Sequence, residues 1–166
     1  MISPKGEGSD LKTIIRACRL ITRMNQARPE APKSEAMYYD MLADYYTRLL
    51  NARETGDFTA AHTVFFPSEI MYAMDILPMH TETTTWMIAL FSGETAEILS
   101  AGADLGLAPE ICSPHRGIAG AFSLGTLPRP DVMLWSNLVC DNTAKSGELL
   151  MEINRCPGFF IDHPFH

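Results

Sequence analysis

The sequence PEICSPHRGIAGAFSLGTLPRPDVMLWSNLVCDNTAK, residues 109–145, decides the fold of this chain. Its apolar run at residues 131–135 follows a Gly/Pro-rich turn and is predicted to be a buried strand. Cys112 and Cys140 lie on either side of this strand, each at an expected boundary between secondary-structure elements and each before a helix-compatible segment. Cysteines at loop positions beside a parallel sheet are placed to hold a metal cluster, so these two are candidate metal ligands.

Around this stretch the chain predicts alternating strands and helices. The expected strands are residues 62–66, 76–80, 108–112, 132–135 and 159–161. The expected helices between them are residues 68–74, 86–106, 114–123 and 141–155, with a polar loop at 81–85. Alternation of strands and helices at this spacing predicts a parallel sheet that helices cover on both faces.

The first third of the chain predicts a pair of helices. Ser9 or Asp10 is expected to cap the first helix, which ends before the proline-containing stretch ARPEAPK. The second helix covers residues 34–55, with Met37 and Met41 on its inward face. These two helices precede the alternating part of the chain and are expected to form a separate appendage.

We therefore expect an α/β fold with an open, mostly parallel sheet, helices on both faces and an N-terminal helical appendage. Residues 1–58 are expected to form the helical segment, disordered over its first nine residues, and residues 59–166 the α/β domain that carries the candidate metal ligands. The chain ends in PGFFIDHPFH, a short strand with no covering helix after it. Two interpretations stay open: a truncated protein or small subunit that meets a partner, and a complete fold with a final edge strand.

Composition and charge exclude several classes of function. Hydrophobic residues make up 46% and charged residues 20% of the 166 residues, as in a soluble globular protein long enough to bury a core. The formal net charge of −7 disfavours nucleic acid and anionic membranes as partners, because both bind basic patches. The chain has no apolar run long enough to span a membrane and opens with no secretory signal. The expected location is the reducing cytoplasm, where cysteines are thiols or metal ligands.

Functional groups of an open α/β sheet gather at the carboxyl ends of its strands. This rule selects the following candidates: His80, Cys112, Ser136, Asn137, Cys140 and the pair Asp162 and His163. The chain lacks the phosphate-binding glycine loop, the dinucleotide-binding glycine motif, the serine-hydrolase elbow and the HExxH zinc motif. A nucleophilic Cys–His pair stays open in two forms, Cys112 with His115 and Cys140 with His163.

The cysteine spacing distinguishes between the kinds of metal site. Cys112 and Cys140 are 28 residues apart, so they form no CxxC clip of the kind that structural zinc sites use. Iron–sulfur clusters tolerate scattered thiolates that the fold brings together. Cys156 is either a further ligand or a buried residue at a helix end, and Cys18 is expected to be a buried apolar residue.

Four motifs occur in order: PSEIMYAMDILPM at residues 67–79, ICS at 111–113, PDVMLWSNLVCDNTAK at 130–145 and FFIDHPF at 159–165. Together they resemble the 2-hydroxyacyl-CoA dehydratase and benzoyl-CoA reductase family, whose pattern has a P-x-E segment before a Leu-Pro strand, a first cysteine, a strand that leads to Cys-Asp, and a strand that ends in Asp-x-Pro. Each motif is weak alone, and their order over residues 64–165 makes the match specific.

The resemblance implies a concrete activity. Members of that family bind a [4Fe–4S] or related cluster through three cysteines per subunit and work as oxygen-sensitive heterodimers or homodimers. A separate ATP-hydrolysing activator supplies one low-potential electron, which reduces a CoA thioester to a ketyl radical and permits dehydration or ring reduction. The resemblance assigns Cys112 and Cys140 as the first two cluster ligands. The family's third cysteine lies in a second domain, so the expectation is a fragment or a subunit that takes this ligand from another polypeptide.

The resemblance also suggests roles for residues near the motifs. Glu69 is a proton-handling group near the thioester or a plain first-turn helix carboxylate. Ser113 and His115 face the substrate or bond the cluster sulfurs, unless His115 is an exposed loop histidine. Arg116 binds a CoA phosphate or is solvated, and Asp141 is expected to cap the helix after Cys140.

Two rival functions keep the same fold. The first is a non-catalytic scaffold or electron-transfer subunit that has lost substrate binding. The second is an ATP-linked cluster reductase of small molecules, which would share the cysteine ligands and differ in its substrate.

Overall fold

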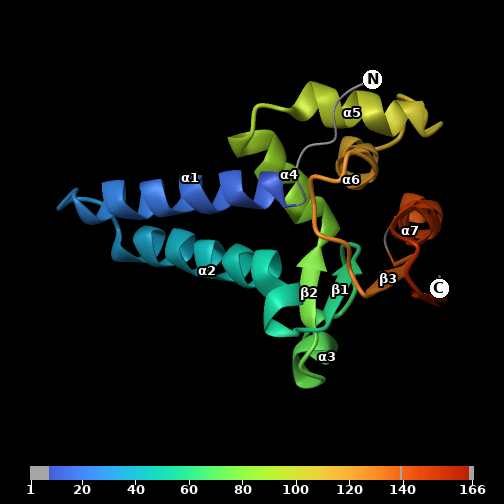
Figure 1. The fold of residues 1–166 in the computed structure, drawn as a ribbon, viewed down its shortest axis with the longest axis horizontal. Coiled ribbons are helices and arrows are strands. Elements are labelled where there is room, and N and C mark those ends of the chain that lie inside the picture. The colour runs from blue at the N-terminus through green and yellow to red at the C-terminus, as the bar shows by residue number, and fades with distance from the viewer. Residues whose placement is uncertain (1–7, 139, 165–166) are drawn as a thin grey trace.

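The computed structural model describes residues 8–138 and 140–164. Four parallel strands form one sheet in the order β2-β1-β3-β4 (Figure 1). The strands are β1 (Thr59–His62), β2 (Leu77–His80), β3 (Val132–Ser136) and β4 (Gly158–Ile161). Helices form the crossover connections that parallel pairing of the strands requires. The expected α/β fold with an open parallel sheet and an N-terminal helical pair is confirmed.

Seven helices lie in the described residues. They are α1 (Ser9–Gln26), α2 (Lys33–Thr55), α3 (Ser68–Ala73), α4 (Thr81–Phe91), α5 (Thr95–Asp104), α6 (Ser113–Ser123) and α7 (Asp141–Asn154). None of these helices is long and apolar enough to cross a membrane.

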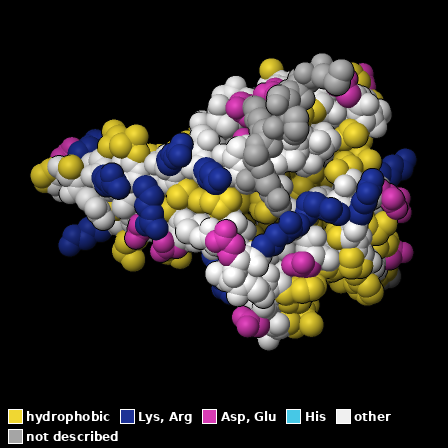
Figure 2. All heavy atoms as spheres, viewed as in Figure 1, with side chains coloured by type: hydrophobic (Ala, Val, Ile, Leu, Met, Phe, Trp, Pro, Cys, Tyr) yellow, Lys and Arg dark blue, Asp and Glu magenta, His cyan; other side chains and the backbone are white. Residues whose placement is uncertain are grey.

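The first two helices form an antiparallel pair that projects from the end of the sheet (Figure 1). Arg19 of α1 is paired with Asp40 and Asp44 of α2, at 2.5 Å from Asp44. Lys and Arg side chains are visible along this pair in Figure 2. Met37 and Met41 point outward and are exposed, so their expected inward position is wrong.

The start of α1 also differs from expectation. Gly8 is its N-cap residue, in the left-handed conformation at φ 75°, and no side chain caps the helix. Neither Ser9 nor Asp10 is therefore the cap. The disorder expected for the first nine residues falls mostly outside the described range, but Ser9 is already helical.

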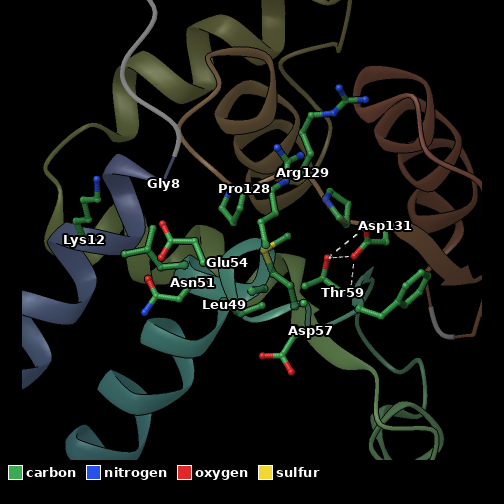
Figure 3. A pocket seen from close by; sticks show the side chains of 17 residues that line it. Gly8, Lys12, Leu49, Asn51, Glu54, Asp57, Thr59, Pro128, Arg129 and Asp131 are labelled. Atoms are coloured by element: carbon green, nitrogen blue, oxygen red, sulfur yellow. Dashed lines mark hydrogen bonds between the residues drawn. The ribbon is translucent and has the colours of Figure 1, made fainter.

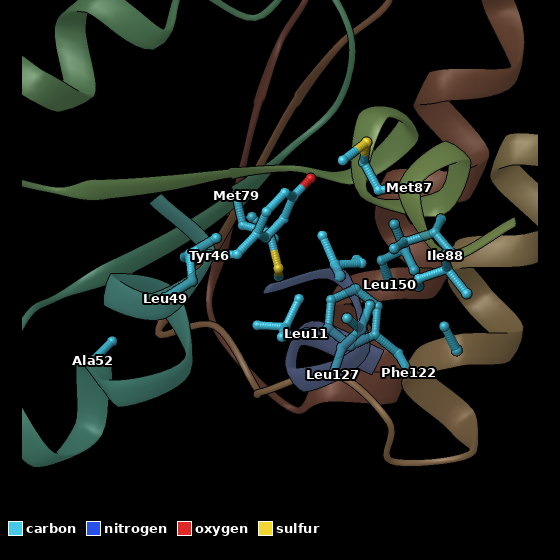
Figure 4. Close-up of a cluster of buried hydrophobic side chains, with 14 of the residues drawn as sticks. Leu11, Tyr46, Leu49, Ala52, Met79, Met87, Ile88, Phe122, Leu127 and Leu150 are labelled. Carbon is cyan, nitrogen blue, oxygen red and sulfur yellow. The ribbon is translucent and has the colours of Figure 1, made fainter. Parts of the chain in front are cut away.

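One hydrophobic cluster joins the helical pair to the sheet (Figure 4). Leu11 of α1 and Tyr46 and Leu49 of α2 pack in the same cluster as Met79 of β2 and Leu150 of α7. Along each strand the side chains alternate between faces. Ala61 accordingly belongs to this cluster, whereas Ala60 packs on the opposite face with Phe66 and Met71.

The first strand and the polar run 81–85 differ from their predicted structure. β1 covers Thr59–His62 rather than 62–66, because residues 63–66 turn away from the sheet and Phe65 adopts a positive φ of 62°. The polar run 81–85 is the first turn and a half of α4 and not a loop. His80 caps this helix, since its Nδ1 accepts a hydrogen bond from the Thr83 amide at 3.2 Å.

The segment between β2 and α6 contains two further differences. The single helix expected at 86–106 is two helices, because Gly93 takes a left-handed conformation between α4 and α5. Residues 108–112, expected to be a strand, contain a turn that leads into α6. Cys112 is therefore the N-cap residue of α6 and does not end a strand.

Candidate functional site at the carboxyl edge of the sheet

Six polar side chains from five elements meet where β1 and β2 end. We call this set the edge site: His62 of β1, His80 of β2, Glu82 of α4, His115 of α6, and Cys140 and Ser146 at the start of α7. The strands are parallel, so their carboxyl ends share one edge. The first turns of α4 and α6, and the first two turns of α7, bring the remaining groups to it.

Glu82 is the buried carboxylate of the edge site, with 4% of its surface exposed. Its Oε2 accepts hydrogen bonds from the Val64 amide at 2.9 Å and the Thr81 hydroxyl at 2.7 Å. Its Oε1 has no hydrogen-bond partner among the described residues. A buried carboxylate oxygen without a partner is costly, so it indicates a position where a ligand or water is bound.

His115 lies at the centre of the edge site and is 3% exposed, so it is not an exposed loop histidine. Its Nδ1 is 3.0 Å from the Ser146 hydroxyl oxygen and 3.9 Å from Glu82 Oε1. Its Nε2 is 3.9 Å from the Cys140 sulfur. Burial lowers the pKa of His115, and the Glu82 carboxylate opposes this only in part, so the ring is neutral at pH 7.

Two more histidines belong to the edge site, and His80 is the one that lies beside Glu82. The His62 and His80 rings meet edge to face with their centres 5.0 Å apart. Burial, with a smaller effect of His80, lowers the pKa of His62 to about 4. Burial also lowers the pKa of His80, although its Nδ1 lies 3.6 Å from Glu82 Oε2. Both rings are therefore neutral; the His62 Nδ1 is 3.1 Å from the Thr63 carbonyl oxygen, and His80 lies beside the carboxylate.

Cys112 and Cys140 occupy equivalent positions, each the N-cap residue of a helix. Cys112 is exposed, Cys140 is half-buried, and both are free thiols. Asp141 lies in the first turn of α7 and is not the cap. His115, one helical turn after Cys112, contacts Cys140, so the two thiols lie at the same edge of the sheet. Helix N-termini favour thiolates.

These two thiols fit part of an iron–sulfur site. Thiolates are the ligands that such clusters use, and both cysteines are free to supply them. Within residues 8–138 and 140–164, however, no group of three or more His, Cys, Asp and Glu side chains is arranged to hold a metal. A complete site would therefore need further ligands from outside the described residues.

The other predicted residues lie around or outside the edge site. Ser113 is the exposed first residue of α6, and Glu69 is exposed on α3, which contributes nothing to the edge site. Arg116 is half-buried, and its Nε has no hydrogen-bond partner among the described groups.

A second polar group joins the ends of β3 and β4. Asn137 donates a hydrogen bond to Asp162 Oδ1 at 2.5 Å and accepts one from the His163 amide at 2.7 Å. The Ser136 hydroxyl is buried and unpartnered among the described groups. Neither predicted nucleophilic pair is formed among the described residues: Cys140 contacts His115 and not His163, and the Cys112 thiol makes no hydrogen bond to the His115 ring.

Sequence reasoning missed His62, Glu82 and Ser146. Glu82 lies in the polar run 81–85, which the sequence predicts to be a loop. Its position two residues after the end of β2 nevertheless indicates a functional residue, because such residues gather at the carboxyl ends of strands. Ser146 has no sequence signal, since only the packing of α7 on α6 brings it to His115.

A cavity of about 530 Å³ lies at the opposite edge of the sheet (Figure 3). Lys12, Asn51, Glu54 and Arg129 line it together with Thr59, at the start of β1. The Thr59 amide and hydroxyl donate hydrogen bonds to Asp131 Oδ2 at 2.7 and 2.9 Å. Because Thr59 is the first residue of β1 and His62 the last, this cavity is separate from the edge site.

Residues 63–166 match the family described as 2-hydroxyglutaryl-CoA dehydratase, D-component. The match includes all four motifs that carried the resemblance and confirms it. The chain is also similar to the (R)-2-hydroxyisocaproyl-CoA dehydratase alpha subunit of Clostridioides difficile, with 24% identity over 142 residues. That similarity covers 82% of this chain and 35% of the relative, so the chain spans about a third of the relative's length.

Proposed function

Because the chain belongs to the 2-hydroxyglutaryl-CoA dehydratase D-component family, we propose that it is part of an enzyme that dehydrates a 2-hydroxyacyl-CoA or reduces a related CoA thioester. The observation that carries the proposal is the edge site: a buried carboxylate with one unpartnered oxygen, beside two free thiols at helix N-termini. Lyase chemistry at a thioester needs such a proton acceptor, and electron delivery needs such thiolates.

Cys112 and Cys140 are the proposed ligands of an iron–sulfur cluster, [4Fe–4S] or related. When bound, it would supply the thioester with one low-potential electron, received from an ATP-dependent activator. Both cysteines lie at helix N-termini, where the dipoles of α6 and α7 stabilise a negatively charged group bound there. The remaining ligand and the second face of the site are proposed to come from a second subunit or a further domain.

Glu82 is the proposed proton-handling residue, in place of Glu69. Its Oε1 is buried and free to accept a proton from the substrate or hold one for the departing hydroxyl. The Val64 amide and Thr81 hydroxyl keep Oε2 fixed, so the free oxygen is held in one orientation. Arg116, with its unpartnered Nε, is the proposed contact for a phosphate of the CoA moiety.

Anaerobic reconstitution with ferrous iron and sulfide tests the ligand assignment. Charge-transfer absorbance and EPR should report a cluster in the wild-type chain, in the presence of its second subunit where that is required. Cys112→Ser and Cys140→Ser should each lose most of this signal, whereas Cys156→Ser should keep it. An unchanged signal in both of the first two variants would rule out this pair as ligands.

A non-catalytic scaffold or electron-transfer subunit is the second candidate. Only two thiols lie near the edge site within the described residues, which favours a chain that holds part of a cluster without substrate. Calorimetry with a 2-hydroxyacyl-CoA separates the two candidates, because only the catalytic subunit should bind the thioester.

A further inference from the structure

We propose that His115 is a positioning residue for Cys140: its Nε2–H donates a hydrogen bond to the Cys140 thiolate, and Ser146 holds the ring in the tautomer that allows this. The inference rests on the proposed cluster ligation by Cys140. It adds to that ligation a residue from a different helix, one that controls the electronic properties of the ligand sulfur.

The contact is a tertiary one between two helices. His115 lies in the first turn of α6, Cys140 is the N-cap residue of α7, and Ser146 lies in the second turn of α7. The His115 Nε2 is 3.9 Å from the Cys140 sulfur, while Nδ1 is 3.0 Å from the Ser146 hydroxyl oxygen. Because His115 and Ser146 are 3% and 4% exposed, water does not compete for either ring nitrogen.

The tautomer follows from the chemistry of a metal-bound thiolate. A ligating cysteine carries no proton, so its sulfur can only accept a hydrogen bond. Nε2 must then carry the ring proton, which leaves a lone pair on Nδ1. The Ser146 hydroxyl can donate to that lone pair at 3.0 Å; its alternative acceptor, the Thr143 carbonyl oxygen, is farther away at 3.4 Å. A hydrogen bond from Ser146 would therefore stabilise this tautomer.

A hydrogen bond to a ligand sulfur withdraws electron density from it. The reduced form of an iron–sulfur cluster gains more from this than the oxidised form, so the bond raises the reduction potential. His115 would thus tune how readily an electron is accepted at this site. It acts through Cys140 and touches no substrate atom, which makes it a positioning residue.

The test compares variants of the full chain after anaerobic reconstitution with ferrous iron and sulfide. His115→Leu should shift the midpoint potential to more negative values, and the Fe–S stretching bands in resonance Raman spectra should lose their sensitivity to H/D exchange. His115→Gln keeps an N–H donor and should restore part of both signals. Ser146→Ala should shift the potential in the same direction as His115→Leu, by a smaller amount.

Ser123→Ala is the matched control, because Ser123 is an exposed residue at the other end of α6. Circular dichroism and thermal unfolding show which variants keep the fold, and Ser146→Ala carries the test if His115→Leu does not fold. Wild-type potential and H/D sensitivity in folded His115→Leu, or in folded Ser146→Ala where His115→Leu does not fold, would overturn the inference and leave the proposed function intact. If the wild-type chain, with its second subunit, holds no cluster, the ligation and this inference fail together.

Discussion

At the scale of single residues, the edge site is a buried polar network around one carboxylate. Glu82 accepts two hydrogen bonds on one oxygen and leaves the other free, while three neutral imidazoles surround the site. Burial that keeps the histidines uncharged makes them donors and acceptors of fixed geometry.

Glu82 is expected to be required for turnover. Glu82→Gln replaces one carboxylate oxygen by an amide that cannot accept a proton, with almost no change of shape. Removing a general acid–base group lowers turnover by about 100-fold or more. We therefore expect this loss in dehydratase assays with a 2-hydroxyacyl-CoA, the activator and the second subunit. Glu69→Gln on exposed α3 is the control, and an inactive control with an active Glu82→Gln would reverse the assignment.

The buried histidines are expected to make the free energy of unfolding depend on pH. Burial lowers the pKa of His62 to about 4, against about 6.5 in the unfolded chain. The unfolded state therefore binds more protons as pH falls, so the free energy of unfolding decreases from pH 6.5 towards pH 4. His62 alone should account for roughly 2 kcal/mol between pH 7 and pH 5. His80 and His115 act in the same direction.

Urea unfolding at pH 7 and pH 5 measures this difference. His62→Gln should reduce the pH dependence, whereas His163→Gln, outside the edge site, should keep it. Equal pH dependence in the wild type and His62→Gln would mean that His62 is not buried as a neutral ring.

At the scale of elements, glycines allow α5 and α6 to pack closely enough to place His115. A Cβ atom at Gly120 of α6 would overlap the Ile98 carbonyl oxygen of α5, and one at Gly102 of α5 would overlap the Arg116 carbonyl oxygen. Backbone carbonyls cannot move aside without moving the helix. The separation of the two helices is therefore set by these two residues, and with it the position of the first turn of α6.

Gly120→Ala should push these helices apart. Overpacking of this kind costs about 1–3 kcal/mol, which corresponds to a fall in Tm of about 2–4 °C per kcal/mol for a chain of this size. Thermal unfolding followed by circular dichroism measures the change. Gly106→Ala is a matched control for the added methyl group, because no atom lies near its Cβ position, although its φ of 89° adds strain. Gly120→Ala should be the more destabilising of the two by calorimetry as well.

At the scale of the whole molecule, the helical pair and the sheet share one hydrophobic cluster. The Tyr45 hydroxyl of α2 also donates a hydrogen bond to the Pro78 carbonyl of β2 at 2.7 Å, and burial raises the pKa of Tyr45. Removing residues 8–58 would expose Leu77 and Met79, which are buried in the intact chain. The helical segment therefore supports the sheet.

We expect the full chain to unfold in a single transition and a fragment of residues 59–166 to lack a cooperative one. Calorimetry and denaturant titrations of both proteins measure this. A cooperative transition in the fragment would establish residues 59–166 as an independent domain, as the sequence alone predicts.

Much of the fold could be predicted from sequence, because apolar periods and prolines act locally. The run that forms β3 and the break between α1 and α2 both follow from such signals. The helical start of α4 could not, since Thr81 to Thr85 contains four threonines, which favour extended structure, and the His80 cap overrides this preference.

The edge site was less predictable than the fold. The position of Cys140 after a strand predicts it as a site residue. Glu82 and Ser146, in contrast, are brought to His115 by helix packing. The prediction that Met37 and Met41 face inward was wrong for a related reason. Small residues of α2, Ala36, Ala43 and Ala52, face inward and allow the two long helices to approach, which leaves the methionines in solvent.

The edge site collects side chains from His62 to Ser146, across five elements that are far apart in the chain. No partial fold contains all of them, so the site exists only after the sheet and its helices have assembled. Loading of the proposed cluster would then be a maturation step that follows folding and cannot guide it. Nascent chains still on the ribosome should bind no iron at Cys140, and metal limitation should leave a folded, inactive protein rather than an unfolded one.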